Sequence, residues 1–550
     1  MNPDGISYLD LGDAFFHGDW KNAINGSWSP LFSWIVSAGL YVFKPSIYKE
    51  FQLAHWMQFL VYVAALISFH FFLIEILRWN QKKTSLKFLL FSDIFWLLLG
   101  YSLFLWASLK LITLISVTPD MVAISFLFLS SGMLLRILNG GISISNFFLL
   151  GILLGLGYLA RAPFFPLAFI FLIVTFIGIR NIPKAVPLTL AALFSFLLIS
   201  GPYLLALSNS KQRFTFSESG KLNYAWKING VPRFVHWQGT PGYGKPKHPT
   251  RKIFDTPAIY EFGTPIGGTY PPWYDPSYWY EGVETHFDFK QQLSRIGINL
   301  KYYFEIFFQT GDKSGFQSIF KGDLFLGAYL ILVLLSGRKR LILNDILQEY
   351  PMILPAIFGL GMYVLIWIEP RYVAGYFILL LLALFSSIRL PDTPENKRVS
   401  NIVAIVVSAL VIIGVAASII LSSYVSFQDS MSGKSNFVYA DVAQDLQKMG
   451  IQPGTKVSNI GYTFEAYWAR LAHVKIVSEI TDDDEKDFWN ATPDLRKIVY
   501  EKIAETGASI LVAYRPPKGT NLDDWSEIGQ TDYYVYFLAK GNTIDDSKHQ

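Results

Sequence analysis

The chain has 550 residues, of which 52% are hydrophobic, 16% are aromatic and only 16% are charged. A composition this apolar is unusual for a soluble enzyme and typical of a membrane protein. The net charge of +4 is small and the basic residues fall between apolar runs, which argues against a nucleic-acid partner. The absence of cysteine excludes disulfides, thiolate metal sites and cysteine nucleophiles.

The first 50 residues are polar and acidic compared with the rest of the chain. Four aspartates stand close together, namely Asp4, Asp10, Asp13 and Asp19. An apolar stripe at helical spacing lies among them: Tyr8, Leu11, Phe15 and Phe16. The simplest interpretation is a helix on the membrane surface whose aspartates form a solvated face and a helix cap. Residues 30–43 are too few to span the membrane comfortably, so we expect them to form a helix that lies at the membrane interface.

The rest of the chain contains apolar runs, and each is close to the length that a helix needs to cross about 30 Å of hydrocarbon. They occupy residues 51–77, 91–113, 118–137, 146–160, 162–179, 186–207, 320–337, 351–368, 372–389 and 401–425. The fourth and fifth runs are short, but together they are too long for one helix. The break at Arg161-Ala162-Pro163 therefore predicts a hairpin. The fold class expected is an α-helical polytopic membrane protein with about ten transmembrane helices.

Basic residues set the expected orientation, because cytoplasmic loops are enriched in Lys and Arg. If the chain crosses the membrane once in each apolar run, one group of cations lies on a single side of the membrane: Arg78, Lys82, Lys83, Lys87, Arg136, Arg180, Lys184, Arg338, Lys339, Arg340, Arg389, Lys397 and Arg398. We predict that this face is cytoplasmic. Lys110, Arg161 and Arg371 break the pattern, because they fall at outer helix ends.

The same alternation places every large polar segment on the outer side. The expected parts are a first external loop with an interfacial helix (1–50), transmembrane helices (51–207), a large external loop (208–319), further transmembrane helices (320–425) and an external soluble domain (426–550). We expect a multi-pass protein of the cytoplasmic (inner) membrane, with these loops on the periplasmic or extracellular side. Because residues 1–28 do not resemble a signal peptide, this topology implies a first helix upstream of Met1 or an unusual insertion route.

The tail has the pattern of a small α/β domain. Residues 441–450 and 493–507 have helical periodicity, whereas residues 455–461, 474–480 and 508–514 are typical of short strands. The tail contains no phosphate-binding glycine loop. We therefore expect this domain to serve acceptor recognition or stability.

The large external loop offers two kinds of candidate binding residue. The aromatic run GTYPPWYDPSYWYEG, Gly268 to Gly282, supplies rings that stack on sugars or rest at the membrane interface, and the second interpretation is the simpler. His236, His248 and His286 are candidate metal ligands beside a carboxylate. Histidines in loops are usually ordinary surface residues, so neither set identifies a site alone.

Several short motifs share an order along the chain and a predicted outer position. Asp4 is followed by Tyr8, Gly18-Asp19-Trp20 and Ser29-Pro30-Leu31. Further along come Thr118-Pro119-Asp120, LGYLARAP (Leu156 to Pro163) and EPRYVAGYFILL (Glu369 to Leu380). Together they resemble the polyprenol-linked glycosyltransferases of the GT-C fold, which include the protein O-mannosyltransferases and the lipid A aminoarabinose transferase. The resemblance covers residues 1 to 390 approximately.

The resemblance implies an integral-membrane glycosyltransferase that moves a sugar from a polyprenyl-phosphate donor to an envelope acceptor, which is a lipid, a polysaccharide or a protein. Asp4 is then the base of an inverting transfer, and Asp120 orients the acceptor or a metal ion. Fixed cations near the headgroup plane stabilise the charge that develops on the departing phosphate. The implied substrate-binding residues are Tyr8, Lys110, Arg161, Arg371 and Tyr372.

The chain departs from the family pattern at two places. Gly5 stands where the family usually has a second carboxylate, and Trp28-Ser29 replaces a Glu-x-Pro or Lys-Pro step. A metal ligand found in some relatives is therefore in doubt. The sequence leaves open whether a divalent metal ion takes part.

Most of these residues also have a purely structural interpretation. Lys110 would reach the outer headgroups, and Asp120 would cap its helix. Arg371 would pair with the nearby Glu369. Arg161 is harder to explain in this way, because an arginine at mid-membrane costs about 2.5–3.5 kcal/mol on insertion scales.

Two other classes of function compete with the transferase. A membrane transporter or lipid flippase also places cations inside the membrane, but it is expected to have two related halves with broken helices. The sequence contains no such repeat. A non-catalytic envelope scaffold would tolerate Gly5 and Ser29.

Overall fold

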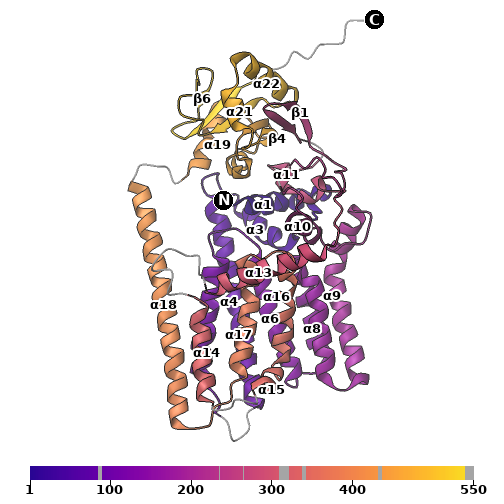
Figure 1. Ribbon diagram of the computed structural model, residues 1–550, viewed down its shortest axis with the longest axis vertical. Coiled ribbons are helices and arrows are strands. Elements are labelled where there is room, and N and C mark those ends of the chain that lie inside the picture. The colour runs from indigo at the N-terminus through magenta and orange to yellow at the C-terminus, as the bar shows by residue number, and fades with distance from the viewer. Residues whose placement is uncertain are drawn as a thin grey trace.

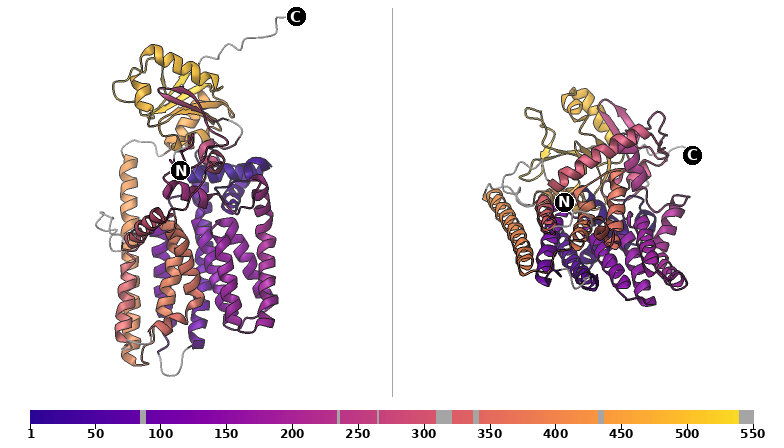
Figure 2. Two further views of the ribbon diagram at one scale, coloured as in Figure 1. Left: turned by 45° about the vertical axis from the view of Figure 1, so that its right-hand side comes forward. Right: turned by 60° about the horizontal axis from the view of Figure 1, so that its bottom comes forward.

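The computed structural model describes residues 1–83, 89–233, 236–263, 266–308, 321–336, 342–431 and 437–538. The described chain is mostly helical and contains one small sheet. A bundle of long helices forms one end of the molecule, and the sheet with its own helices forms the other (Figure 1). The amino-terminal helices lie between these two parts (Figure 2). The predicted helical architecture with a small carboxy-terminal α/β domain is therefore confirmed.

Every apolar run predicted to span the membrane overlaps a helix. These helices are α4 (Glu50–Lys83), α5 (Asp93–Leu105) with the π-helical turn Trp106–Ile112, α6 (Asp120–Leu138), α7 (Ile144–Ala160), α8 (Phe164–Ile179), α9 (Ile182–Ser210), α14 (Asp323–Leu335), α16 (Tyr350–Val364), α17 (Pro370–Ser386) and α18 (Pro394–Met431). In the described chain, five are long and apolar enough to cross a membrane by length and composition: α4, α5 with its π-helical turn, α6, α9 and α18. The break at Arg161 separates α7 from α8 as predicted.

Local sequence signals explain where several of these helices begin and end. Ser92 caps α5 by accepting a hydrogen bond from the Phe95 amide at 3.1 Å. Ser143 caps α7 in the same way, because a hydroxyl can satisfy an amide that has no partner within the helix. Helix α8 ends at Ile179, and the next residue, Arg180, has a left-handed φ of 55°. Within the bundle, α6 packs against α4 and α7, and α17 packs against α16.

Charged residues tie helices together at the end of the bundle that lies away from the sheet. The Glu75 carboxylate of α4 accepts hydrogen bonds from Arg78 and from Arg136 of α6. Glu349 accepts a hydrogen bond from Trp79 at 2.9 Å. The short helix α15 (Ile342–Leu347) lies at the same end (Figure 1). Four cations assigned to the cytoplasmic face lie outside the described residues: Lys87, Arg338, Lys339 and Arg340.

Shorter helices cover the end of the bundle that faces the sheet. They are α1 (Pro3–Phe16), α2 (Trp20–Ala23), α3 (Pro30–Phe43), α10 (Ser219–Lys227), α11 (Pro271–Tyr274), α12 (Pro276–Trp279) and α13 (Phe289–Phe308). Helix α1 packs on α3 and α11. Helix α13 is fixed to the end of α16, because Asn299 donates to the Val364 carbonyl and Tyr303 donates to the Leu360 carbonyl.

The sheet contains strands from two distant parts of the chain. Its strands are β1 (Arg251–Asp255), β2 (Ala258–Glu261), β3 (Lys456–Ile460), β4 (Lys475–Ile480), β5 (Ile510–Tyr514), β6 (Ser526–Glu527) and β7 (Tyr533–Phe537), in the order β1-β2-β4-β3-β5-β7-β6. Strand β3 is parallel to β4 and β5, and the other pairs are antiparallel. The hairpin β1–β2 covers the edge of β4 that would otherwise be open. The sheet therefore joins the large external loop to the tail.

Each face of the sheet has its own apolar core, because successive side chains of a strand point to opposite faces. Helices α19 (Val438–Lys448) and α20 (Tyr467–Leu471) share one core with Val457, Ile476 and Val512. That core also contains Ile6 of α1. Helices α21 (Glu485–Asn490) and α22 (Pro493–Glu505) cover the opposite face. The sheet domain is thus packed directly on the amino-terminal helix.

Candidate active site

Asp4 and Arg371 meet although 367 positions separate them in the chain. The Arg371 Nη2 atom lies 2.9 Å from Oδ2 of Asp4. Each residue follows a proline that begins its helix, Pro3 in α1 and Pro370 in α17. Proline suits this position because the first helical amide has no partner within the helix. An arginine in a first turn opposes the helix dipole, so Arg371 depends on nearby carboxylates for stabilisation.

Asp120 extends this ion pair into a network. Its Oδ2 atom lies 3.7 Å from Nη1 of Arg371, and its Oδ1 atom forms an ion pair with Nη1 of Arg161. The Asp120 side chain is 1% exposed, whereas that of Asp4 is 20% exposed. Asp4 is therefore the carboxylate that a substrate can reach, and Asp120 holds both guanidinium groups in place.

Aromatic rings pack around the charged groups. The Arg161 guanidinium carbon lies 3.7 Å from the centre of the Tyr372 ring, an arrangement that favours a cation. The Tyr8 ring is buried edge-on against Trp28 and Phe32, at 5.3 and 5.2 Å. Burial, together with the charge of Asp4, raises the pKa of the Tyr8 phenol. Tyr8 therefore keeps its proton and can act as a hydrogen-bond donor.

Trp273 contacts Asp4, a role that the sequence did not assign to it among the aromatic residues of its run. Its Nε1 atom donates to Oδ1 of Asp4 at 3.3 Å, so each carboxylate oxygen of Asp4 has a fixed partner. Its carbonyl accepts hydrogen bonds from Ser7 and from the Trp28 indole. The aromatic run that contains Trp273 was expected at the membrane interface, but Tyr274 and Trp279 are buried among the external segments. Their hydroxyl and indole groups need hydrogen-bond partners, and they donate to the carbonyls of Asn22 and Pro271 respectively.

A small cavity of about 30 Å³ lies beside the buried part of this network. Its lining includes Asp120, Arg161, Tyr363, Arg371 and Tyr372. That volume suits a water molecule or two, so a larger ligand would enter only when side chains move apart. Lys110 is not among the lining residues and lies in the π-helical turn Trp106–Ile112.

The donor groups at this site do not fit a metal ion. Asp4 and Asp120 are each paired with an arginine, whose charge opposes a divalent cation. Among the described residues, no group of three or more His, Asp or Glu side chains is arranged to hold a metal. The three loop histidines have other partners: His236 with Glu479 and Thr250, His248 with Glu281, and His286 with the Gly242 carbonyl. We therefore derive no chemical step through a metal.

Asp10 and Asp13 belong to a separate network around Arg470 of α20. The Arg470 Nη1 atom lies 2.6 Å from Asp10 and 2.8 Å from Asp13, and its Nε atom lies 2.9 Å from Glu50. The prediction of a solvated face is wrong for Asp10, because the carboxylate is buried against the sheet domain. Burial raises the pKa of Asp10, while the Arg470 charge acts in the opposite direction. The predicted helix cap is confirmed for Asp19, which accepts a hydrogen bond from the Asn22 amide.

Comparison with known proteins identifies similar solved structures at low identity. No protein-family profile matches the chain, and no curated protein matches it. The crystal structure of ArnT from Cupriavidus metallidurans in the apo state is 13% identical, with 98% of this chain and 94% of that chain covered and a TM-score of 0.40. The same protein bound to undecaprenyl phosphate is 12% identical, with coverage of 98% and 94% and a TM-score of 0.37.

A second kind of solved structure is also similar. The oligosaccharyltransferase of Archaeoglobus fulgidus, in complex with Zn and sulfate, is 11% identical, with 93% of this chain and 64% of that chain covered and a TM-score of 0.44. ArnT and the oligosaccharyltransferase are GT-C glycosyltransferases, the class that the sequence motifs resemble. These identities are too low to carry a site residue or a substrate from one chain to the other. A function for this chain therefore has to rest on its own residues.

Proposed function

We propose that the protein is an integral-membrane glycosyltransferase that transfers a sugar from a polyprenyl-phosphate donor to an envelope acceptor, on the outer face of the cytoplasmic membrane. The ion pair between the partly exposed Asp4 and Arg371 carries this proposal. It joins a base to an anion-binding group at the end of a bundle of apolar helices. The headgroup of a membrane lipid lies at such a boundary, and its long apolar chain fits beside the helices.

Arg161 and Arg371 are the proposed phosphate ligands. A guanidinium group has five N–H donors in a planar fork, which matches two oxygens of a phosphate. Asp120 uses only part of this donor set, because it contacts one Nη atom of each arginine. Tyr372 supports the Arg161 guanidinium from its flat face. The two arginines are thereby held in place before the donor arrives.

Donor binding would also release the base. Arg371 contacts Asp4 when no phosphate is present, so a phosphate that enters competes with this carboxylate for the same guanidinium. As Arg371 turns toward the phosphate, the Asp4 carboxylate becomes available to the acceptor. The ion pair thus favours an order in which the donor binds before the acceptor proton is removed.

The transfer then proceeds by inversion. The acceptor hydroxyl or amine attacks the anomeric carbon from the face opposite the phosphate, and Asp4 accepts the proton that the nucleophile loses. The bond between the anomeric carbon and the phosphate oxygen breaks, and its electrons leave with the polyprenyl phosphate. Arg161 and Arg371 stabilise the negative charge that develops on that oxygen. A well-placed general base contributes about 10²–10⁴ to such a rate.

The proposal is tested with purified full-length protein in lipid nanodiscs. The nanodiscs receive a panel of labelled polyprenyl-phosphate hexoses and pentoses, together with envelope lipids, polysaccharides or proteins as acceptors. We expect labelled acceptor from at least one donor, with inverted anomeric configuration by NMR. A retained configuration, or no product from the whole panel, would overturn the proposal. Movement of a fluorescent polyprenyl lipid between leaflets without transfer would instead favour a transporter or lipid flippase.

A further inference from the structure

A second and much larger cavity lies among the external segments. It has a volume of about 730 Å³, which is within the range of small-molecule binding sites. Its lining comes mainly from residues 21–24, 210–222 and 274–284. Many of these side chains are charged or hydroxylated, so the apolar tail of a polyprenyl lipid does not suit this space. The ligand that fits is a hydrophilic one.

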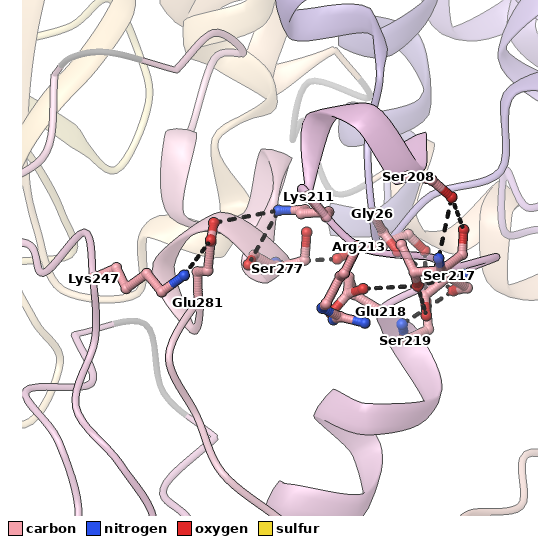
Figure 3. Close-up of polar contacts among 12 residues, drawn as sticks. Gly26, Ser208, Lys211, Arg213, Ser217, Glu218, Ser219, Lys247, Ser277 and Glu281 are labelled. Carbon is pink, nitrogen blue, oxygen red and sulfur yellow. Dashed lines mark hydrogen bonds and ion pairs between the residues drawn. The ribbon is translucent and has the colours of Figure 1, made fainter. Parts of the chain in front are cut away.

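Positive charge gathers around Glu281 on one wall of this cavity. The Lys247 Nζ atom lies 3.1 Å from one Glu281 oxygen, and the Lys211 Nζ atom lies 3.9 Å from the other. Figure 3 shows these two lysines approaching the carboxylate from different sides. His248 lies 3.5 Å from the same carboxylate. Burial alone would raise the pKa of Glu281, but the Lys247 hydrogen bond and the nearby cations lower it. Several cations therefore gather on this wall, while Asp275 and Glu284 are further carboxylates of the cavity lining.

Lys211 has hydrogen-bonding capacity to spare. Its side chain is only 8% exposed, and its contacts within 4 Å are a 3.5 Å hydrogen bond to the Ser277 carbonyl and the 3.9 Å approach to Glu281. The charge of Lys211 also acts on the buried Asp275 carboxylate. Both distances are long for an ammonium group, which has three donors. A buried ammonium group is costly unless it is well paired. An anionic group in the cavity would improve the pairing of Lys211.

Lys221 lines the same cavity as a second cation. Burial lowers the pKa of Lys221, and the charge of Arg213 acts in the same direction, whereas Glu218 and Glu284 oppose this shift without cancelling it. Arg213 itself is committed to Glu218, with Nη2 at 2.5 Å from the carboxylate (Figure 3). An anion beside Lys221 would offset this unfavourable environment. Lys211 and Lys221 are thus two cations on one cavity for which a negative ligand is favourable.

We propose that this cavity binds the acidic part of a saccharide, whose phosphate or carboxylate group is held by Lys211 and Lys221. Hydroxyl groups of the sugar would exchange hydrogen bonds with Asn22, Tyr278 and Glu284, which also line the cavity. The occupant would be the acceptor glycan, an assignment that rests on the transferase function proposed above.

The chain connects this cavity to the candidate active site. Trp273 donates a hydrogen bond to Asp4, and the residues that follow it, Tyr274 to Glu284, supply one wall of the cavity. Ser27 joins the two regions as well, because its hydroxyl donates to Asp275 and its neighbour Trp28 donates to the Trp273 carbonyl. A glycan held in the cavity would lie along the same segment that contacts the base.

Binding to the purified full chain tests this inference without any donor. The probes are glucose 6-phosphate, glucuronic acid and glucose, which differ only at one carbon, together with inorganic phosphate. We expect the two acidic hexoses to bind at least tenfold more tightly than glucose and more tightly than inorganic phosphate, as measured by isothermal titration calorimetry. Equal binding of glucose would overturn the acidic requirement. Equal binding of inorganic phosphate would overturn the saccharide requirement.

Variants locate the binding in this cavity. Lys221→Gln should weaken the binding of glucose 6-phosphate at least fivefold, and Lys211→Met should weaken this binding further. Lys290→Gln, at an exposed lysine of α13 outside the lining, should bind as the parent does. Thermal unfolding shows whether the buried Lys211 position affects folding, and the partly exposed Lys221 keeps the test decisive if it does. Unchanged binding by Lys221→Gln would contradict the proposal.

The two proposals fail in distinguishable ways. Saccharide binding that persists in a protein without transfer activity would support the cavity assignment and contradict the proposed transferase function. Transfer that proceeds without measurable saccharide binding, and with an unchanged KM for the acceptor in Lys221→Gln, would remove the cavity assignment alone.

Discussion

The Asp4 carboxylate and the Arg371 guanidinium form a 2.9 Å ion pair between the first turns of two helices that are far apart in the chain. The pair is partly exposed and is backed by the buried Asp120. A purely structural ion pair would gain nothing from access to solvent, because exposed pairs contribute little to stability. Its exposure is what a site for an anionic substrate requires.

Arg371→Lys should weaken donor binding while the protein stays folded. A lysine ammonium cannot contact Asp4, Asp120 and a phosphate in the geometry of a planar fork. We expect KM for the polyprenyl-phosphate donor to rise roughly tenfold or more, because charge-assisted bidentate contacts are lost. Arg251→Lys is the matched control, since Arg251 pairs with Glu261 on the surface. An equal effect of both substitutions would contradict a phosphate-binding role for Arg371.

Asp120→Asn should destabilise the helix bundle. The substitution removes the carboxylate that pairs with both arginines, and breaking a buried ion pair typically costs about 3–5 kcal/mol. Thermal unfolding in the same nanodisc measures the effect. Asp93→Asn is the control, because Asp93 is also a first-turn aspartate of an apolar helix but is exposed. Equal melting temperatures for the two variants would show that Asp120 does not hold the arginines.

Arg470→Met should loosen the contact between the sheet domain and α1. It leaves Asp10, Asp13 and Glu50 close together without their shared cation, and truncating one partner of a buried charge network costs about 3–5 kcal/mol. Hydrogen exchange in α1 and α20 should rise. Arg515→Met, at an exposed pair with Asp532, should change little.

The Arg470→Met defect should also depend on pH. Arg470 lowers the pKa of Asp10 against burial and the charge of Asp13, so its removal raises this pKa further in the folded state, and folding then favours the protonated form of Asp10. Stability of the variant should therefore improve as pH falls toward the titration range of carboxyl groups. A defect that stays constant across this range would show that Arg470 acts through packing alone.

Glu281→Gln should change stability in a pH-dependent way. The folded-state pKa of Glu281 lies below its usual value of 4.5, so the unfolded chain takes up the proton first as pH falls. The stabilisation by Glu281 is therefore fully present above pH 4.5 and is lost as pH falls through the folded-state value. The variant should melt below the parent at pH 7, and the difference should shrink in acid. A difference that grows in acid would contradict this assignment.

Periodicity predicted the elements that have strong local patterns. The apolar runs became helices, and residues 455–461, 474–480 and 508–514 became the parallel strands β3, β4 and β5. The hairpin β1–β2 was missed because its strands are short, and because its place is set by pairing with β4 far along the chain. Strand pairs of this kind depend on tertiary contacts that a local window does not contain.

The candidate site was also predictable only in part, because local motifs identify residues but not their contacts. The order of motifs singled out Asp4, Asp120, Arg161 and Arg371, and the structure brings these four residues into one network. Their pairing was not predictable, since Glu369 was an equally good partner for Arg371 by sequence. Trp273 was hidden among similar aromatic residues of one run. Nothing local distinguishes the ring that contacts Asp4 from those that pack in the loop.

The rate of a single turnover in the Asp4→Asn variant tests the central claim most directly. Purified variant and parent are mixed with saturating labelled donor and acceptor, and labelled acceptor is followed over time. We expect donor binding to persist and the transfer rate to fall about 10²-fold or more, since asparagine cannot accept the proton. Asp93→Asn should retain the parent rate. A transfer rate in Asp4→Asn equal to that of the parent would contradict the assignment of Asp4 as the base.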